Sequence, residues 1–116
     1  MPLSINRIEA TFQALGAMDR TGLMPYLTMG YPDLESALTL VPTIAEAGAD
    51  LIELGMPFSD PLADGPTIQA ASQQALVNGM TVARCLTQVK ALRDAGVTVP
   101  FVLMGYYNPI LQYGTE

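Results

Sequence analysis

The 116-residue chain contains no histidine, one cysteine and only five lysine and arginine residues. The absence of histidine removes the commonest general base and the commonest metal ligand. Because the single cysteine, Cys85, excludes an internal disulfide, the sequence fits a reducing compartment. No apolar run reaches transmembrane length and the N-terminus has no signal-peptide core, so we expect a cytoplasmic protein that does not enter a membrane.

Positive charge is also scarce, since eleven acidic residues against five basic ones give a net charge of −6. The basic residues do not cluster, which argues against a nucleic-acid surface or an anionic membrane as partner. Half of the residues are hydrophobic and 14% are charged, a balance that favours a packed core over disorder. We therefore expect a globular domain that does not bind nucleic acid.

Three short apolar segments predict strands. We place them at residues 23–29, 51–54 and 100–104, each followed by a glycine, at Gly30, Gly55 and Gly105. The connecting segments have helical periodicity. Strands separated by helices predict a parallel sheet with right-handed crossovers.

Capping residues and glycines mark the predicted helices. A leading amphipathic helix carries apolar residues at spacings of three and four, with Ser4 as N-cap and Gly16 past its end: Ile5, Ile8, Phe12 and Leu15. Asp33 is the expected N-cap of the next helix, which Pro42 should bend or split. Two further helices are expected at 66–77, opened by Pro66, and from Thr81 to just before Gly96. After a Tyr-Tyr-Asn-Pro turn, residues 110–113 form a short apolar piece.

This order of elements predicts the α/β class and, more specifically, the N-terminal part of a (β/α)8 TIM barrel. We expect residues 1–116 to form one partial domain: the leading helix, the first two βα units, the third strand and the start of the segment after it. We expect the C-terminal part of such a barrel to be absent from this chain. An open three-stranded parallel sheet exposes apolar faces and unpaired edges, so either a longer barrel or an assembly has to complete it.

The stretch 51–69 carries the candidate chemistry. Glu53 lies in an otherwise apolar strand, and prolines and glycines stiffen the loop that carries Asp64. Alternation along the strand places Glu53 on the same face as Leu51, which is the lumen in a barrel. Two carboxylates in different environments can divide acid and base work. The residues alone therefore indicate acid/base chemistry at the carboxyl end of a parallel sheet.

Structural alternatives exist for each of these carboxylates. Asp60 and Asp64 can be turn residues that cap their own backbone, and Asp60 is expected to be exposed. Glu53 can belong to a buried ion pair. All three can bind a hard cation, although their spacing matches no known calcium loop.

Two tyrosines and the cysteine complete the candidates. Tyr26 and Tyr106 lie at or near the carboxyl ends of strands, where they either line a flat aromatic substrate or pack in the core with a hydroxyl at the rim. Cys85 lies on the apolar stripe of its helix, which favours an inert buried thiol over a nucleophile.

The motif itself resembles a known family. Residues 52–65, I-E-L-G-M-P-F-S-D-P-L-A-D-G, closely resemble the signature of the tryptophan synthase alpha chain, and P-T-I-Q at 66–69 continues it. The likeness extends to P-Y-L-T-M-G-Y-P at 25–32, E-A-G-A-D at 46–50 and M-G-Y-Y-N-P at 104–109. It covers nearly the whole chain.

The resemblance implies a (β/α)8 lyase of tryptophan biosynthesis that cleaves indole-3-glycerol phosphate to indole and glyceraldehyde 3-phosphate, without metal or organic cofactor. Glu53 matches the catalytic glutamate that protonates the indole ring carbon. Asp64 matches the aspartate that accepts a hydrogen bond from the indole N–H. Tyr26 and Tyr106 match aromatic residues at the indole site.

The resemblance also implies a partner. Pro57, Asp60 and Asn108 match positions that face the beta chain, which uses pyridoxal phosphate to join indole to serine. The two chains form an α2β2 heterotetramer in which indole passes through a tunnel.

One departure from the family limits this expectation. The family's phosphate-binding loops follow strands seven and eight, beyond residue 116, so we expect little or no lyase activity from this chain alone. The alternative is a non-catalytic barrel fragment or a docking module for a beta-like partner. A glycosidase-like hydrolase with two carboxylates is a third hypothesis, but the sequence gives no support for its sugar groove.

Overall fold

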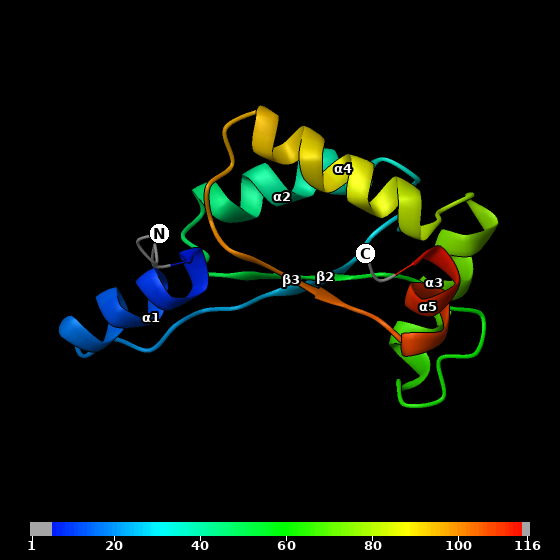
Figure 1. Cartoon of the computed structure of the whole chain (residues 1–116), viewed down its shortest axis with the longest axis horizontal. Coiled ribbons are helices and arrows are strands. Elements are labelled where there is room, and N and C mark those ends of the chain that lie inside the picture. The colour runs from blue at the N-terminus through cyan, green and yellow to red at the C-terminus, as the bar shows by residue number, and fades with distance from the viewer. Residues whose placement is uncertain (1–5, 115–116) are drawn as a thin grey trace.

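Three parallel strands form a single sheet in the order β1-β2-β3 in the computed structural model, which describes residues 6–114. The strands are β1 (Tyr26–Thr28), β2 (Ile52–Gly55) and β3 (Phe101–Met104). The helices are α1 (Arg7–Ala17), α2 (Ser36–Glu46), α3 (Pro66–Val77), α4 (Val82–Asp94) and α5 (Tyr107–Tyr113). Helices α2 and α4 cover one face of the sheet, α3 and α5 lie at its carboxyl end, and α1 lies at its amino end (Figure 1).

The core lies between the sheet and helices α2 and α4. Ile52 and Leu54 are fully buried there, together with Val41 of α2 and Leu92 of α4. Because side chains alternate along a strand, Glu53 points to the opposite face of the sheet. Its register partners are Tyr26 on β1 and Val102 on β3, so these side chains share that second face.

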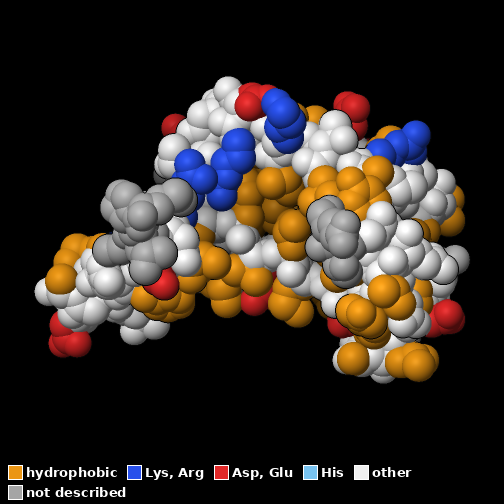
Figure 2. All heavy atoms as spheres, viewed as in Figure 1, with side chains coloured by type: hydrophobic (Ala, Val, Ile, Leu, Met, Phe, Trp, Pro, Cys, Tyr) orange, Lys and Arg blue, Asp and Glu red, His pale blue; other side chains and the backbone are white. Residues whose placement is uncertain are grey.

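The outer edges of the sheet are open, as the sequence predicted. Strands β1 and β3 each pair only with β2 among the residues that the structure describes. Leu103 and Met104 on β3 are 39% and 46% exposed. Hydrophobic side chains gather across the middle of the molecule in the view of Figure 2, below the helical layer.

The predicted strands are confirmed, but β1 is shorter than expected. Residues 23–25 do not belong to the strand because their backbone groups have other partners. The Leu23 N–H donates to Oδ2 of Asp50 at 2.8 Å, and the Leu23 carbonyl accepts from the N–H groups of Asp50 and Leu51. Pro25 has no N–H to offer, and only its carbonyl continues the ladder by accepting from the Glu53 N–H at 2.9 Å.

The predicted start of α2 is wrong. The helix begins at Ser36, its N-cap residue is Glu35, and no side chain caps it. Asp33 therefore does not cap the helix, and its own N–H donates to the Ser36 hydroxyl at 2.9 Å. Pro42 does not split the helix, which runs without interruption from Ser36 to Glu46.

Helices α3 and α4 follow the prediction closely. Pro66 opens α3, and Gly79 adopts a φ of 99° after its end. The Thr81 side chain accepts from the Arg84 N–H and caps α4. The C-terminal segment differs from the prediction, since residues of the expected Tyr-Tyr-Asn-Pro turn already belong to α5. Pro109 is compatible with the first turn of a helix, where the N–H groups have no partner within the helix.

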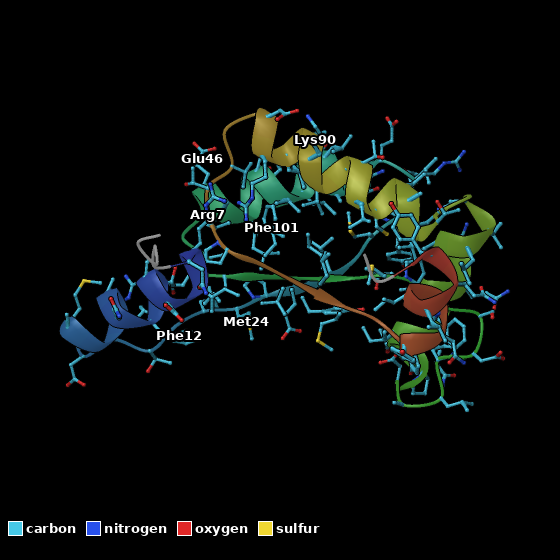
Figure 3. The ribbon with its side chains drawn as sticks, viewed as in Figure 1. Arg7, Phe12, Met24, Glu46, Lys90 and Phe101 are labelled. Atoms are coloured by element: carbon cyan, nitrogen blue, oxygen red, sulfur yellow. The ribbon has the colours of Figure 1, made fainter. Side chains whose placement is uncertain are left out.

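The leading helix α1 is confirmed with different ends. Asn6 caps it by accepting from the Glu9 N–H at 2.9 Å, and Gly16 lies inside the helix. The proposed cap Ser4 lies outside the described residues. Phe12 and Met24 are 56% and 44% exposed, and Met24 lies on the side of the strands away from α2 and α4 (Figure 3). Across residues 6–114, no helix combines the length and apolar character that a membrane crossing requires.

Candidate active site

A pocket of about 200 Å³ lies at the carboxyl end of the sheet. Strands β1 and β3, the loop between β2 and α3, and α3 itself contribute to its lining. Tyr26, Asp64 and Tyr106 are among the lining residues, together with the apolar side chains of Met56 and Ile68. The pocket therefore combines aromatic walls with one carboxylate.

Asp64 is held beside Tyr106. The Tyr106 hydroxyl donates to Oδ2 of Asp64 at 3.3 Å and accepts from the Ala63 N–H at 2.8 Å. The two residues are 42 positions apart, so tertiary structure brings them together. The backbone of Asp64 is also fixed, because its N–H donates to the Pro61 carbonyl at 3.1 Å. The Asp64 carboxylate therefore contacts another part of the chain and is partly buried in the pocket.

Ser72 fixes the start of the same loop. Its hydroxyl accepts from the Phe58 N–H at 3.0 Å and donates to the Phe58 carbonyl at 3.4 Å. The Phe58 ring packs on the Tyr106 ring with a centroid distance of 5.2 Å. Neither Phe58 nor Ser72 stands out as a site residue in the sequence. The available signal was the spacing of Ile68 and Ser72, since residues four apart on a helix lie on the same face.

Glu53 lies in the centre of the sheet and is half-buried. Glu53 does not line the pocket. Its register partner Tyr26 does, and the two side chains lie on the same face of the sheet. The ion pairs within residues 6–114 are Arg20 with Asp50 and Lys90 with Asp94, and neither includes Glu53. A buried ion pair of Glu53 therefore has no support in the described part of the chain.

Tyr26 crosses β2 close to Glu53. A Cβ added to Gly55 would overlap the Tyr26 hydroxyl, so the tyrosine lies directly against the glycine backbone. The hydroxyl accepts a hydrogen bond from the Thr28 hydroxyl at 3.4 Å. Gly55 is therefore needed for this close approach, because any side chain would displace the aromatic ring.

The three predicted partner-facing residues differ in exposure. Asp60 is exposed, as expected, and so is Asn108, whereas Pro57 is buried. Leu62, at the outer side of the same loop, is 87% exposed. The loop therefore presents both an apolar and an acidic side chain to solvent.

The structure gives no support to a metal site made by Glu53, Asp60 and Asp64. No group of three or more acidic, cysteine or histidine side chains within residues 6–114 is arranged to hold a metal ion. Cys85 is fully buried in the core, and this burial raises the pKa of its thiol to about 12. The thiol is therefore neutral and inert at physiological pH, as the sequence predicted.

A family model described as the tryptophan synthase alpha chain matches residues 12–116. The chain belongs to the tryptophan synthase alpha chain family. A relative with that name from Chloroflexus aggregans is 59% identical over 112 residues, which are 97% of this chain and 42% of the relative. The relative from Roseiflexus sp. is also 59% identical and is covered to 43%.

Solved structures of the tryptophan synthase family have the same fold. The crystal structure of the alpha subunit from Legionella pneumophila str. Paris aligns with a TM-score of 0.92 at 42% identity, over 96% of this chain and 42% of that one. An aminoacrylate-bound tryptophan synthase from M. tuberculosis aligns with a TM-score of 0.85 at 40% identity, over 95% of this chain and 44% of that one. The chain thus spans about 42% of the length of the curated relatives it matches. The predicted fold class, the first part of a tryptophan synthase alpha barrel, is confirmed.

Proposed function

We propose that this chain provides the acid and base groups of a lyase that cleaves indole-3-glycerol phosphate into indole and glyceraldehyde 3-phosphate. Glu53 donates a proton to the indole ring carbon at the bond that breaks. Asp64 accepts a hydrogen bond from the indole N–H and stabilises the positive charge that develops on the ring. The Glu53 carboxylate left by this proton transfer then accepts the hydroxyl proton of the neighbouring carbon, which leaves as the aldehyde, while the electrons of the broken bond return to the ring. No cofactor takes part.

The observation that supports this proposal most is that Asp64 lies in a pocket with two tyrosines, one of which shares a face of the sheet with Glu53. Tyr26 and Tyr106 line the pocket that contains Asp64, and flat aromatic walls suit a bicyclic ring. Tyr26 is also the register partner of Glu53. A ring bound against Tyr26 would therefore lie close to both carboxylates.

We further infer that residues 1–116 supply the first three strands of one (β/α)8 domain. The open edges of β1 and β3 would pair with the remaining strands, and the loops after later strands would hold the substrate phosphate. In this arrangement the phosphate contributes binding energy that positions the reacting carbon. The buried Cys85 and the absence of other cysteines suit the reducing cytoplasm.

We propose a beta chain as partner, in an α2β2 assembly in which pyridoxal phosphate belongs to the beta chain. Asp60 and Asn108 are exposed at the carboxyl end of the sheet, and Pro57 is buried near the start of the loop that carries Asp60. One observation also favours the alternative of a docking module without activity: Leu62 is 87% exposed on this stiff loop, as an anchor for a partner surface would be.

A chimaera tests the catalytic proposal. Residues 1–116 are joined to the C-terminal remainder of the Chloroflexus aggregans alpha chain, and indole release from indole-3-glycerol phosphate is measured. We expect the chimaera to release indole and the 116-residue chain alone to release little or none. A chimaera that folds with native-like circular dichroism, binds a beta chain and releases no indole would support the docking module instead.

A further inference from the structure

The side chain of Gln69, on the first turns of α3, bonds to the loop that carries Asp64. Its Nε2 donates to the Pro61 carbonyl at 3.2 Å and to the Asp64 carbonyl at 2.9 Å. Figure 1 shows α3 at the carboxyl end of the sheet, directly after this loop. The carboxamide therefore connects the two ends of the turn at residues 61–64.

The orientation of this carboxamide follows from its partners. The NH₂ group of glutamine carries two hydrogens, and both partners are carbonyl oxygens, which can only accept. The opposite orientation would place Oε1 against two acceptors. The Gln69 backbone is fixed as well, since its N–H donates to the Gly65 carbonyl at 2.9 Å.

A second restraint acts on the same turn from another element. The Tyr106 hydroxyl accepts from the Ala63 N–H at 2.8 Å and contacts Oδ2 of Asp64. Tyr106 holds the pocket side of the turn, whereas Gln69 holds its backbone through the carbonyls of Pro61 and Asp64. The turn is otherwise exposed, with Leu62 and Ala63 open to solvent. Gln69 is therefore the donor that the Pro61 and Asp64 carbonyls share.

We propose that Gln69 is a positioning residue for Asp64, acting through the backbone of the turn and not on substrate. This inference rests on the proposed lyase function of the pocket. It gives a role to a residue of the signature stretch that neither the pocket lining nor the candidate catalytic pair includes.

Gln69→Met tests this role because methionine keeps the length of the side chain and the helix propensity but has no donor. Gln73→Met is the matched control, since Gln73 is an exposed glutamine one turn further along α3 that makes no side-chain hydrogen bond among the described residues. In the chimaera we expect Gln69→Met to lower kcat about tenfold with little change in KM, because a misplaced group costs most in the transition state. Gln73→Met should match the parent.

Two further measurements separate positioning from a general structural effect. Backbone ¹⁵N relaxation should give lower order parameters at Ala63, Asp64 and Gly65 in Gln69→Met than in the parent, whereas Gln73→Met should match the parent. In an Asp64→Asn background, Gln69→Met should lower kcat by much less than tenfold, because its effect passes through Asp64.

A Gln69→Met chimaera with the parental kcat and the parental backbone order parameters would overturn the inference. So would an equal loss of kcat from Gln69→Met in the parental and the Asp64→Asn background. An inactive parental chimaera would contradict the proposed function instead. The relaxation data on the turn would then decide alone whether Gln69 holds it.

Discussion

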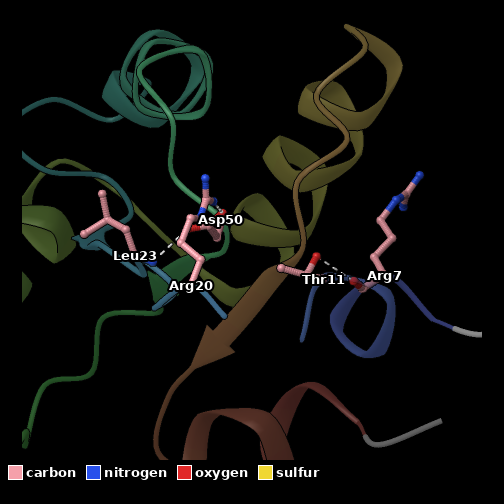
Figure 4. A network of polar contacts seen from close by, with 5 residues as sticks. All are labelled: Arg7, Thr11, Arg20, Leu23 and Asp50. Atoms are coloured by element: carbon pink, nitrogen blue, oxygen red, sulfur yellow. Dashed lines mark hydrogen bonds and ion pairs between the residues drawn. The ribbon is translucent and has the colours of Figure 1, made fainter. Parts of the chain in front are cut away.

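Charged side chains at the two ends of the sheet differ in whether they have partners of opposite charge. At the amino end, Asp50 pairs with Arg20 and also accepts from a backbone N–H (Figure 4), and Arg93 donates to two backbone carbonyls at 2.9 and 2.6 Å. Toward the carboxyl end, neither Glu53 in the middle of β2 nor Asp64 in the loop after it has a basic partner in the described residues, and the Asp64 carboxylate accepts a hydrogen bond from a tyrosine hydroxyl. Charges that are neutralised at one end support structure, and carboxylates left without cations at the other end are available for chemistry.

Arg93 has structural contacts on several sides at the amino end of the sheet. Its guanidinium carbon lies 4.0 Å from the centre of the Phe101 ring, an attractive cation–π contact. Desolvation by burial, followed by repulsion from Arg7, lowers the pKa of Arg93, which nevertheless remains a cation at neutral pH. The group therefore joins α4 to the start of β3 as a structural clamp.

The largest expected effect is at the carboxyl end. Glu53→Gln in the chimaera should lower kcat by roughly a hundred- to ten-thousandfold, because the amide cannot donate the proton as an acid. The urea midpoint should not fall, since no ion pair is lost. Rates of indole release and urea unfolding curves measure the two quantities. A folded variant with parental kcat would remove Glu53 from the mechanism.

The opposite result is expected at the amino end. Asp50→Ala leaves the Leu23 N–H without its acceptor and breaks the pair with Arg20, so the free energy of unfolding should fall by about 1–3 kcal/mol. Under conditions where the protein is folded, kcat should equal that of the parent. If Asp50→Ala lowered kcat as strongly as Glu53→Gln, the two ends would not have separate roles.

The stability of the fold should also depend on pH through Cys85, which lies on α4 in the helical layer. Burial raises the pKa of Cys85 from 9.0 to about 12, so the folded state holds the thiol proton more tightly than the unfolded state. This contribution to stability is complete below pH 9 and is lost as the pH rises toward 12, by at most about 1.4 kcal/mol per unit. Urea unfolding between pH 8 and 11 measures it. Cys85→Ala should have a flatter profile, and an equal slope in both proteins would rule out the thiol as the cause.

The smallest effect is expected at the surface. Lys90 and Asp94 form an ion pair at 2.7 Å on α4, with Lys90 on the outer side of the helix (Figure 3), and this pair raises the pKa of Lys90 through its hydrogen bond. Exposed pairs contribute little because water and salt screen them. Lys90→Ala should therefore leave both the urea midpoint and kcat unchanged within error. A clear loss of either would show that charge outside the two ends also matters.

Local signals in the sequence were enough to place most elements. Pro66, Thr81 and the glycines at 79 and 96 mark helix ends through backbone geometry, which depends on few neighbours. The start of α2 was missed because the Asp33 N–H donates to the Ser36 hydroxyl and no side chain caps the helix, which begins three residues later. The short β1 was missed because Asp50, 27 positions away, takes the Leu23 N–H.

The candidate site was predicted only in part. Glu53 and Asp64 stand out in the sequence as carboxylates in an apolar strand and a stiff loop. The contact between Asp64 and Tyr106 joins residues 42 positions apart, and no spacing rule predicts such a pair. The same holds for the bond between Phe58 and Ser72, 14 positions apart. Side chains that support a site from another element become visible only in three dimensions.

A crystal structure of the chimaera with bound indole tests the central claim most directly. We predict that the ring lies between Tyr26 and Tyr106, with its N–H on the Asp64 carboxylate and its reactive carbon toward Glu53. Indole bound elsewhere, or a ring in the pocket with the two carboxylates on the same side of it, would contradict the division of work between Glu53 and Asp64.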